Sequence, residues 1–168
     1  MEVATAKVKE LREQSGAGIM ACRNALIEAK GDTEKALQIL KEKGILKAQK
    51  KSGRATNQGL IEAYIHTGGR IGAMVEVNCE SDFVARTDEF KDLAHDLAMQ
   101  VAAMPPQFIT RDEITADKGD TELQTACLFL QPYIKNPTKT VQDIVTETIA
   151  KVGENIRVSR FARFELGE

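Results

Sequence analysis

Apolar residues recur at helical spacing in three short runs near the start of the chain. Each run returns to the same face every three or four residues, which is the pattern of an amphipathic helix. We expect the first two helices to end at Gly16 and Gly31. The third is expected to begin at an Asp32 N-cap and to stop at Gly44. The residues predicted to face inward are Ala4, Val8, Leu11, Ile19, Cys22, Leu26, Ala29, Ala36, Leu37, Ile39 and Leu40. The pattern predicts a compact three-helix module over residues 1–46.

Strand patterns begin after this module. Residues 59–66 and 71–79 are strand-like, and the turn Thr67-Gly68-Gly69-Arg70 separates them, which indicates a β-hairpin. The second strand places alternate residues from Ile71 to Cys79 on one face. Thr87 is then expected to cap a helix that runs through Ala103.

The last third of the chain continues the mixture of helices and strands. We expect a short helix within 121–130, an extended segment at 133–136 and a helix from a Thr140 cap to Gly153. A long strand should follow over residues 155–166. Its alternation predicts one face with Ile156, Val158, Ala162, Phe164 and Leu166, and the other with Arg157, Ser159, Phe161, Arg163 and Glu165. Phe161, among charges, either packs against an overlying helix or belongs to an oligomer interface.

These elements predict an α+β protein in which a helical N-terminal module precedes an α+β core. The core is expected to hold a small, mostly antiparallel sheet packed on helices over residues 59–168. Residues 47–58 are basic at first and then rich in small polar residues, so we interpret them as a linker: a solvated helical face that leads into a hinge. A phosphate-binding role for this charge run is the alternative, but no glycine-rich loop with the lysine of a nucleotide cradle occurs in the sequence.

The composition is that of an ordinary globular protein. Of 168 residues, 42% are hydrophobic and 29% charged, and the net charge of −2 argues against extensive neutralisation of nucleic-acid phosphates. We therefore expect a protein or small-molecule partner and no direct contact with nucleic acid. No stretch approaches the roughly 20 apolar residues that a membrane helix needs, and the N-terminus lacks the apolar core of a signal peptide, so we expect a cytoplasmic protein.

Residues suited to metal or acid–base chemistry are few. The histidines, His66 and His95, lie on different predicted elements without a cysteine or carboxylate at ligand spacing, so we expect no metal, no cofactor and no catalytic base. Cys22, Cys79 and Cys127 are odd in number and widely spaced, which favours reduced thiols over a disulfide framework.

An enzyme remains an alternative only because several carboxylates lie near one strand. Glu76, Glu80 and Asp82 are close in sequence. Along an extended chain, however, Glu76 and Glu80 would lie roughly 13 Å apart, too far to act as a carboxylate pair without a sharp bend.

The junction between the hairpin and the helix that follows it carries the most informative residues. Glu80 to Thr87 connects two well-defined elements, and such a junction presents side chains from a rigid base. Phe83 either plugs the core beneath the helix or is an exposed anchor for a partner. The residues alone leave both interpretations open.

Residues 76–86 read Glu-Val-Asn-Cys-Glu-Ser-Asp-Phe-Val-Ala-Arg. This run closely resembles the signature of the elongation factor Ts family, usually written Thr-Asp-Phe-Val-Ala, with Ser81 in place of the threonine. The run GAGIMACRNALIEAKGDTEKALQILKEKG resembles the family's N-terminal domain, which is like a ubiquitin-associated domain. Ile19 stands where methionine is common and Ala21 where aspartate is common. The last 38 residues also resemble the family, which leaves residues 109–129 unmatched. The resemblance also implies a short strand at residues 107–110.

The resemblance implies guanine-nucleotide exchange on the GTPase elongation factor Tu, with no covalent chemistry. It implies that Asp82 and Phe83, flanked by Ser81 and Val84, insert near the Mg²⁺ and phosphate region of the GTPase. It also implies contacts to the GTPase from Arg12, Ile19 and Met20, although Met20 could instead fill a gap in the core. The chain resembles the short form of the family, which implies a homodimer. A binding adaptor with another partner remains the alternative.

Overall fold

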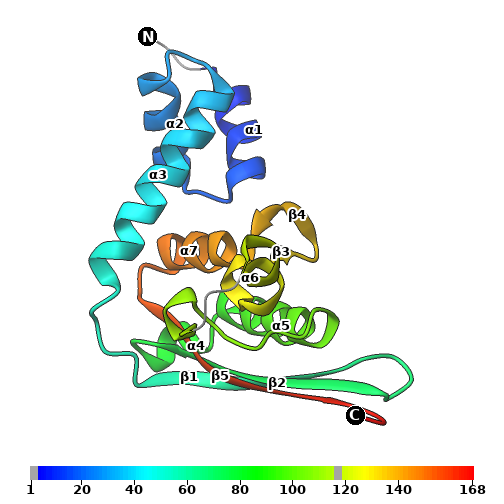
Figure 1. Cartoon of the computed structure of the whole chain (residues 1–168). Coiled ribbons are helices and arrows are strands. Elements are labelled where there is room, and N and C mark those ends of the chain that lie inside the picture. Colours follow the sequence, from blue (N-terminus) through cyan, green and yellow to red (C-terminus); the bar gives the residue numbers. More distant parts are fainter. Residues whose placement is uncertain (1–3, 116–118) are drawn as a thin grey trace.

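The N-terminal helices form a small module with its own core. The computed structural model describes residues 4–115 and 119–168. The module contains α1 (Thr5–Ser15), α2 (Ile19–Glu28) and α3 (Thr33–Lys51) (Figure 1). Gly16 ends α1 in the left-handed conformation, and the Asp32 side chain accepts a hydrogen bond of 3.1 Å from the Lys35 amide, as predicted. Its buried residues are Val8, Leu11, Cys22, Ala25, Leu26, Ala29 and Ala36.

The third helix is longer than the sequence predicted. Gly44 does not end it, and α3 runs on to Lys51, with 19 residues in all. A Cβ atom on Gly44 would lie 3.9 Å from the Ala150 Cβ of α7 (Val141–Val152), so α3 passes close against the core at this point. Lys41 forms an ion pair of 3.1 Å with Asp143 of α7. The first part of the basic segment 47–58 is therefore helical and packed on the core side, while the division into domains stays a prediction.

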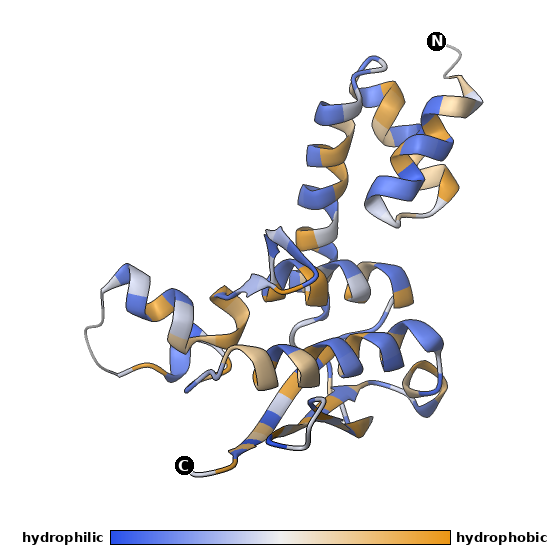
Figure 2. Ribbon diagram, turned by 90° about the vertical axis from the view of Figure 1, so that its right-hand side faces the viewer, coloured by the Kyte–Doolittle hydropathy of each residue, from blue (hydrophilic) through white to orange (hydrophobic). Residues whose placement is uncertain are grey.

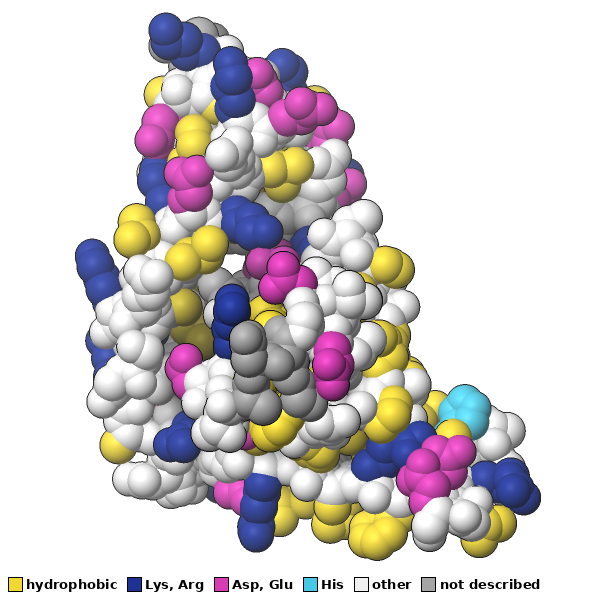
Figure 3. Space-filling view, in the orientation of Figure 1, with side chains coloured by type: hydrophobic (Ala, Val, Ile, Leu, Met, Phe, Trp, Pro, Cys, Tyr) yellow, Lys and Arg dark blue, Asp and Glu magenta, His cyan; other side chains and the backbone are white. Residues whose placement is uncertain are grey.

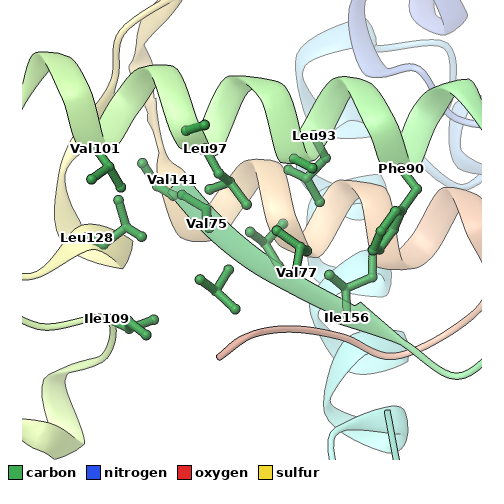
Figure 4. Packing of buried hydrophobic residues seen from close by; sticks show 14 of the residues in the cluster. Val75, Val77, Phe90, Leu93, Leu97, Val101, Ile109, Leu128, Val141 and Ile156 are labelled. Atoms are coloured by element: carbon green, nitrogen blue, oxygen red, sulfur yellow. The ribbon is translucent and has the colours of Figure 1, made fainter. Parts of the chain in front are cut away.

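A three-stranded antiparallel sheet forms the base of the core. β1 (Gln58–Ile65) and β2 (Ile71–Cys79) make the predicted hairpin, and β5 (Ile156–Glu165) pairs with the other edge of β2. The helix α5 (Asp88–Ala103), capped by Thr87 as predicted, covers one face of this sheet. Its apolar stripe faces the side chains of β2 and α7 (Figure 4), and these residues belong to one buried cluster. The labelled residues are Val75, Val77, Phe90, Leu93, Leu97, Val101, Ile109, Leu128, Val141 and Ile156.

Shorter elements complete the core. They are α4 (Asp82–Ala85), α6 (Asp120–Ala126), two 3₁₀ turns (Arg111–Glu113 and Leu128–Leu130) and the small hairpin of β3 (Pro132–Tyr133) and β4 (Asn136–Thr140). The strand predicted at 107–110 is wrong, because only an isolated bridge joins Phe108 to Cys127 there. The helix predicted within 121–130 breaks into α6 and a 3₁₀ turn.

The predicted alternation along β5 is wrong beyond Val158. The register with β2 shifts where Val77 pairs with Val158 and Glu76 pairs with Arg160, so Ser159 is an extra residue. A bulge of this kind reverses the faces of the residues that follow. Phe161 consequently packs against the core, as one of the two interpretations required, whereas Phe164 is 77% exposed.

The whole molecule consists of a helical layer on one sheet face, with the N-terminal module above it (Figures 1 and 2). The fold class is confirmed: N-terminal helices precede an α+β core with small antiparallel sheets. No helix within residues 4–115 and 119–168 has the length and apolar character needed to cross a membrane.

Candidate functional site

The junction after β2 is a sharp corner with an exposed aromatic ring. Ser81 caps the short helix α4, and its Oγ accepts a hydrogen bond of 3.4 Å from the Val84 amide. Phe83 is 79% exposed, so it does not plug the core. Ala85 is buried, and Val84 is half-buried against the core cluster. The corner therefore has an anchored inner side and a free outer side that carries the ring of Phe83.

Asp82 lies beside Phe83 on this outer side. Its Oδ2 accepts an ion-pair contact of 2.9 Å from an Arg86 guanidinium nitrogen, one helical turn later. Both side chains are well exposed, and pairs of this kind contribute little to stability. Asp82 can therefore exchange Arg86 for a polar group of a partner at small cost.

Cys79 supports the corner from below. Its thiol is fully buried at the end of β2 and donates a hydrogen bond of 3.1 Å to the Ser81 carbonyl oxygen. Burial raises the pKa of Cys79 to about 11, and the negative charges of Glu154 and Asp82 act in the same direction. The thiol therefore stays protonated at neutral pH and keeps its role as a donor.

The other cysteines have similar structural roles. All three are free and buried. The Cys22 thiol donates to the Ala17 carbonyl oxygen at 3.6 Å, and the Cys127 thiol donates to that of Ile109 at 3.4 Å. Each thiol thus satisfies a backbone carbonyl near a chain turn, a role that their spacing in the sequence did not indicate.

A second exposed patch lies in the N-terminal module. Ile19 and Met20 begin α2 and are 56% and 59% exposed. Arg12, near the end of α1, is also exposed, and the turn through Gly16 brings the two helix ends together. The prediction that Ile19 faces inward is therefore wrong, and Met20 does not fill the core, because Cys22 and the next turn of α2 supply the buried face.

The structure does not bring this patch to the corner. The patch belongs to α1 and α2, which pack on the first part of α3, and the 19 residues of α3 span about 28 Å at the usual rise of an α-helix. Figure 1 shows α1 and α2 at one end of this helix, with the corner at α4 close to the sheet. A single partner that touches both must be large, which favours a protein over a small ligand.

Both histidines contact Tyr64 although they are distant in sequence. The Tyr64 hydroxyl lies 3.0 Å from His66 Nδ1, and the His95 ring stands edge-on to the Tyr64 ring at 5.8 Å between centroids. Glu62 Oε1 lies 3.2 Å from His95 Nδ1. Within residues 4–115 and 119–168, however, no group of three or more His, Cys, Asp and Glu side chains could hold a metal ion.

The carboxylates that suggested an enzyme have separate partners. Glu76 lies on the outer sheet face, where its Oε2 is 2.6 Å from Arg160 Nε; this contact and the Asn78 amide lower its pKa. Glu80 points instead toward Asn155. Neither pairs with the other as an acid and a base would.

Sequence reasoning missed an apolar surface on the face of the sheet away from α5. Five large hydrophobic side chains there are more than half exposed: Ile61, Ile65, Met74, Phe164 and Leu166. Figure 3 shows hydrophobic side chains along the lower edge of the molecule, beneath the sheet, and Figure 2 shows apolar and polar positions alternating along the strand toward the C-terminus. The signal was present in Ser159-Arg160, two consecutive polar residues that interrupt the alternation and mark the bulge.

Comparisons with known proteins agree with the family that the sequence resembles. The family described as Elongation factor TS matches residues 10–126. Elongation factor Ts of Thermotoga maritima is 48% identical, with 100% of this chain and 98% of the relative covered. The proteins of the same name from Carboxydothermus hydrogenoformans and Heliobacterium modesticaldum are each 47% identical, with 99% of this chain and 90% and 91% of the relatives covered. The alignments extend over 195 positions, so these relatives carry residues without a counterpart in this 168-residue chain. The chain belongs to the elongation factor Ts family.

Proposed function

We propose that this protein is a guanine-nucleotide exchange factor that binds GDP-bound elongation factor Tu and promotes release of GDP during translation elongation. Membership of the elongation factor Ts family supports this role. The observation that carries it is the 79% exposed Phe83, held out from a corner whose inner side is buried. An exposed aromatic ring on a rigid base is suited to anchor a protein partner.

In this proposal, the corner acts as a wedge. A GTPase holds its nucleotide through backbone N–H groups around the phosphates and through Mg²⁺. Insertion of Phe83 near that region, with Asp82 making polar contacts beside it, displaces those groups and weakens the binding of GDP. Ser81 and Val84 hold the wedge in place. No covalent bond is made or broken, so none of these residues has a catalytic role.

The exposed patch of the N-terminal module, which we call the module patch, provides a second contact with the GTPase. Arg12, Ile19 and Met20 are exposed together and away from the corner. Binding through this patch increases affinity without touching the nucleotide site. Thermodynamic linkage also requires that GDP weaken the binding of this protein by the same free energy that this protein takes from GDP binding.

The test is release of a fluorescent GDP analogue from purified elongation factor Tu in excess unlabelled GDP. The wild-type protein should accelerate release as its concentration rises. Phe83→Ala should fold normally and lose about tenfold or more of the stimulated rate, since the wedge is gone. Leu46→Ala is the matched control, because Leu46 is an exposed apolar residue of α3 outside both patches, and it should keep the full rate.

Two outcomes would contradict parts of this proposal. Full activity of Phe83→Ala would remove the corner from the mechanism. If folded wild-type protein neither accelerates release nor forms a complex with elongation factor Tu, the exchange function is wrong and a binding adaptor with another partner becomes the better account.

The bare sheet face supports a second proposal, that two copies of this chain form a homodimer. The face holds two apolar cross-strand rows: Ile65 and Phe164 on either side of Gly72, and Met74 between Ala63 and Ala162. Ile61 extends this apolar area at the edge of the Glu76–Arg160 ion pair. Apolar patches of this extent commonly mark interaction sites. A two-fold axis lets the same patch cover itself on a second copy.

A further inference from the structure

The corner is held by a residue that lies more than seventy positions later in the chain. Glu154 follows Gly153, the C-cap of α7. Its Oε2 accepts hydrogen bonds from the backbone amides of Glu80 at 3.1 Å and Ser81 at 2.9 Å. Its Oε1 accepts a third bond, of 2.5 Å, from the Ser81 hydroxyl. One carboxylate thus receives three donors from two consecutive residues.

These bonds fix the residue that begins α4. The Ser81 hydroxyl has one proton, which it donates to Glu154, and its oxygen accepts the Val84 amide at 3.4 Å. The Ser81 carbonyl accepts the Cys79 thiol. Ser81 is therefore held at its amide, its carbonyl and its side chain. Because Asp82 and Phe83 follow directly, their direction is set by this residue.

The contact is reciprocal and reaches the chain that leaves α3. Glu80 Oε1 accepts the Asn155 amide at 2.7 Å and pairs with Arg54 at 3.5 Å. Asn155, only 8% exposed, donates its side-chain amide to the carbonyl oxygens of Ser52 at 3.3 Å and Arg54 at 3.0 Å. The turn Glu154–Asn155 therefore fastens the corner to the segment that connects the N-terminal module to the sheet.

We propose that Glu154 is a positioning residue for exchange, a role that rests on the proposed function. Phe83 is 79% exposed, so packing holds little of its ring, and a wedge at this position depends on the backbone beneath it. Hydrogen bonds to an ionised carboxylate are stronger than neutral ones, and Glu154 supplies three of them to that backbone. Without them the corner should still bind the GTPase, but it should spend less time in the orientation that displaces the nucleotide-binding groups.

The test separates the maximal rate of stimulated GDP release from the protein concentration that gives half of it. Glu154→Ala should lower the maximal rate about tenfold and change the half-maximal concentration less than about threefold, since the module patch is intact. Glu154→Gln keeps an acceptor but loses the charge, so its maximal rate should lie between those of the wild type and Glu154→Ala. In a Phe83→Ala background, Glu154→Ala should cause no further loss, because it acts through the corner.

A control removes another partly buried carboxylate that stabilises the fold away from the corner. Asp96 pairs with Lys135 and accepts the Tyr133 hydroxyl, and its side chain is 15% exposed. Asp96→Ala should keep the maximal rate even if it lowers the midpoint of urea unfolding as much as Glu154→Ala. An unchanged maximal rate in Glu154→Ala, an equal loss in Asp96→Ala or a further loss in the Phe83→Ala background would each overturn the positioning role.

Amide hydrogen exchange tests whether Glu154 holds the corner, and it does so without elongation factor Tu. In Glu154→Ala, exchange at the amides of Glu80, Ser81 and Val84 should accelerate about tenfold or more, with α5 and β2 unchanged. Unchanged protection of these three amides would show that Glu154 does not hold the corner. If the wild-type protein fails to accelerate GDP release while these amides respond as expected, the proposed function is wrong and the positioning of the corner stands.

Discussion

Gly59 occupies a position in β1 that no other residue fits. Its φ of +146° is rarely adopted by residues with a side chain, and a Cβ there would lie 2.1 Å from the Val77 carbonyl oxygen. The neighbouring strand β2 supplies that oxygen, and backbone cannot move aside as a flexible side chain can. The chain at the start of the sheet therefore depends on this one glycine.

We expect Gly59→Ala to destabilise the protein by about 2 kcal/mol or more, because strain and overlap act together. Urea unfolding followed by circular dichroism measures the change. Gly53→Ala is the control: a Cβ there would meet no atom within 4 Å, so the free energy of unfolding should change by about 0.5 kcal/mol or less. Equal stability of the two variants would contradict the overlap at Gly59.

Two phenylalanines show that residue type alone does not predict burial. Phe83 and Phe90 are seven positions apart, yet Phe90 is fully buried and Phe83 is 79% exposed. The helical stripe that includes Leu93 and Leu97 placed Phe90 inward from the sequence. Phe83 lies in a four-residue helix, too short for a periodic pattern, so only the family resemblance favoured exposure before the structure did.

At the scale of elements, capping residues predicted helix starts better than glycines predicted helix ends. Asp32, Thr87 and Thr140 cap their helices as expected. Gly44 failed as a stop because a glycine inside a helix also allows another helix to come near, and α7 is there. Which of these roles a glycine has depends on packing, which the local sequence does not contain.

The contact between Gly44 and Ala150 leads to a prediction for α3. A Cβ at Gly44 would meet Ala150 at 3.9 Å, an ordinary van der Waals distance, so alanine fits. We expect Gly44→Ala to raise the free energy of unfolding by about 0.5–1 kcal/mol, since alanine restricts the unfolded chain and favours the helix. Thermal and urea unfolding measure the gain.

Gly44→Leu tests the same interface from the other side. Its larger side chain would push α3 away from α7, so this variant should lose about 1–3 kcal/mol. A loss of stability in Gly44→Ala would mean that the two helices are already too close for a methyl group.

At the scale of the whole molecule, the decisive feature is the uncovered face of the sheet. Helices protect one face, while Ile65, Met74 and Phe164 remain on the other. A sheet with one bare apolar face leaves that apolar area exposed to water in a monomer. A dimer that pairs two such faces buries it, which is favourable. The proposed homodimer accounts for this face, and its two corners would then lie on one assembly.

We expect Phe164→Glu to shift the protein from dimer to monomer in sedimentation velocity, because a buried charge without a partner opposes pairing. Circular dichroism should show an unchanged fold, since Phe164 does not face the core. Leu46→Glu places the same charge on an exposed residue outside the sheet and should stay dimeric. A monomeric wild-type protein at micromolar concentration would contradict the proposal.

Local sequence was enough to predict the order of the main helices and strands, the positions of most caps, the hairpin and the corner. These depend on periodicity, on capping side chains and on turn residues, all of which act within a few positions along the chain. The run around Asp82 and Phe83 was also enough to indicate the family. Such local information is complete in the sequence.

Which apolar surfaces are exposed, how far α3 extends and what holds the corner became clear only from the packed chain. The bulge at Ser159 turned Phe164 outward, α7 allowed α3 to continue past Gly44, and Glu154 met Ser81 from the far end of the chain. Each outcome depends on a neighbour that is distant in sequence. Burial and hydrogen-bond partners are properties of the packed chain, and for that reason no local pattern could supply them.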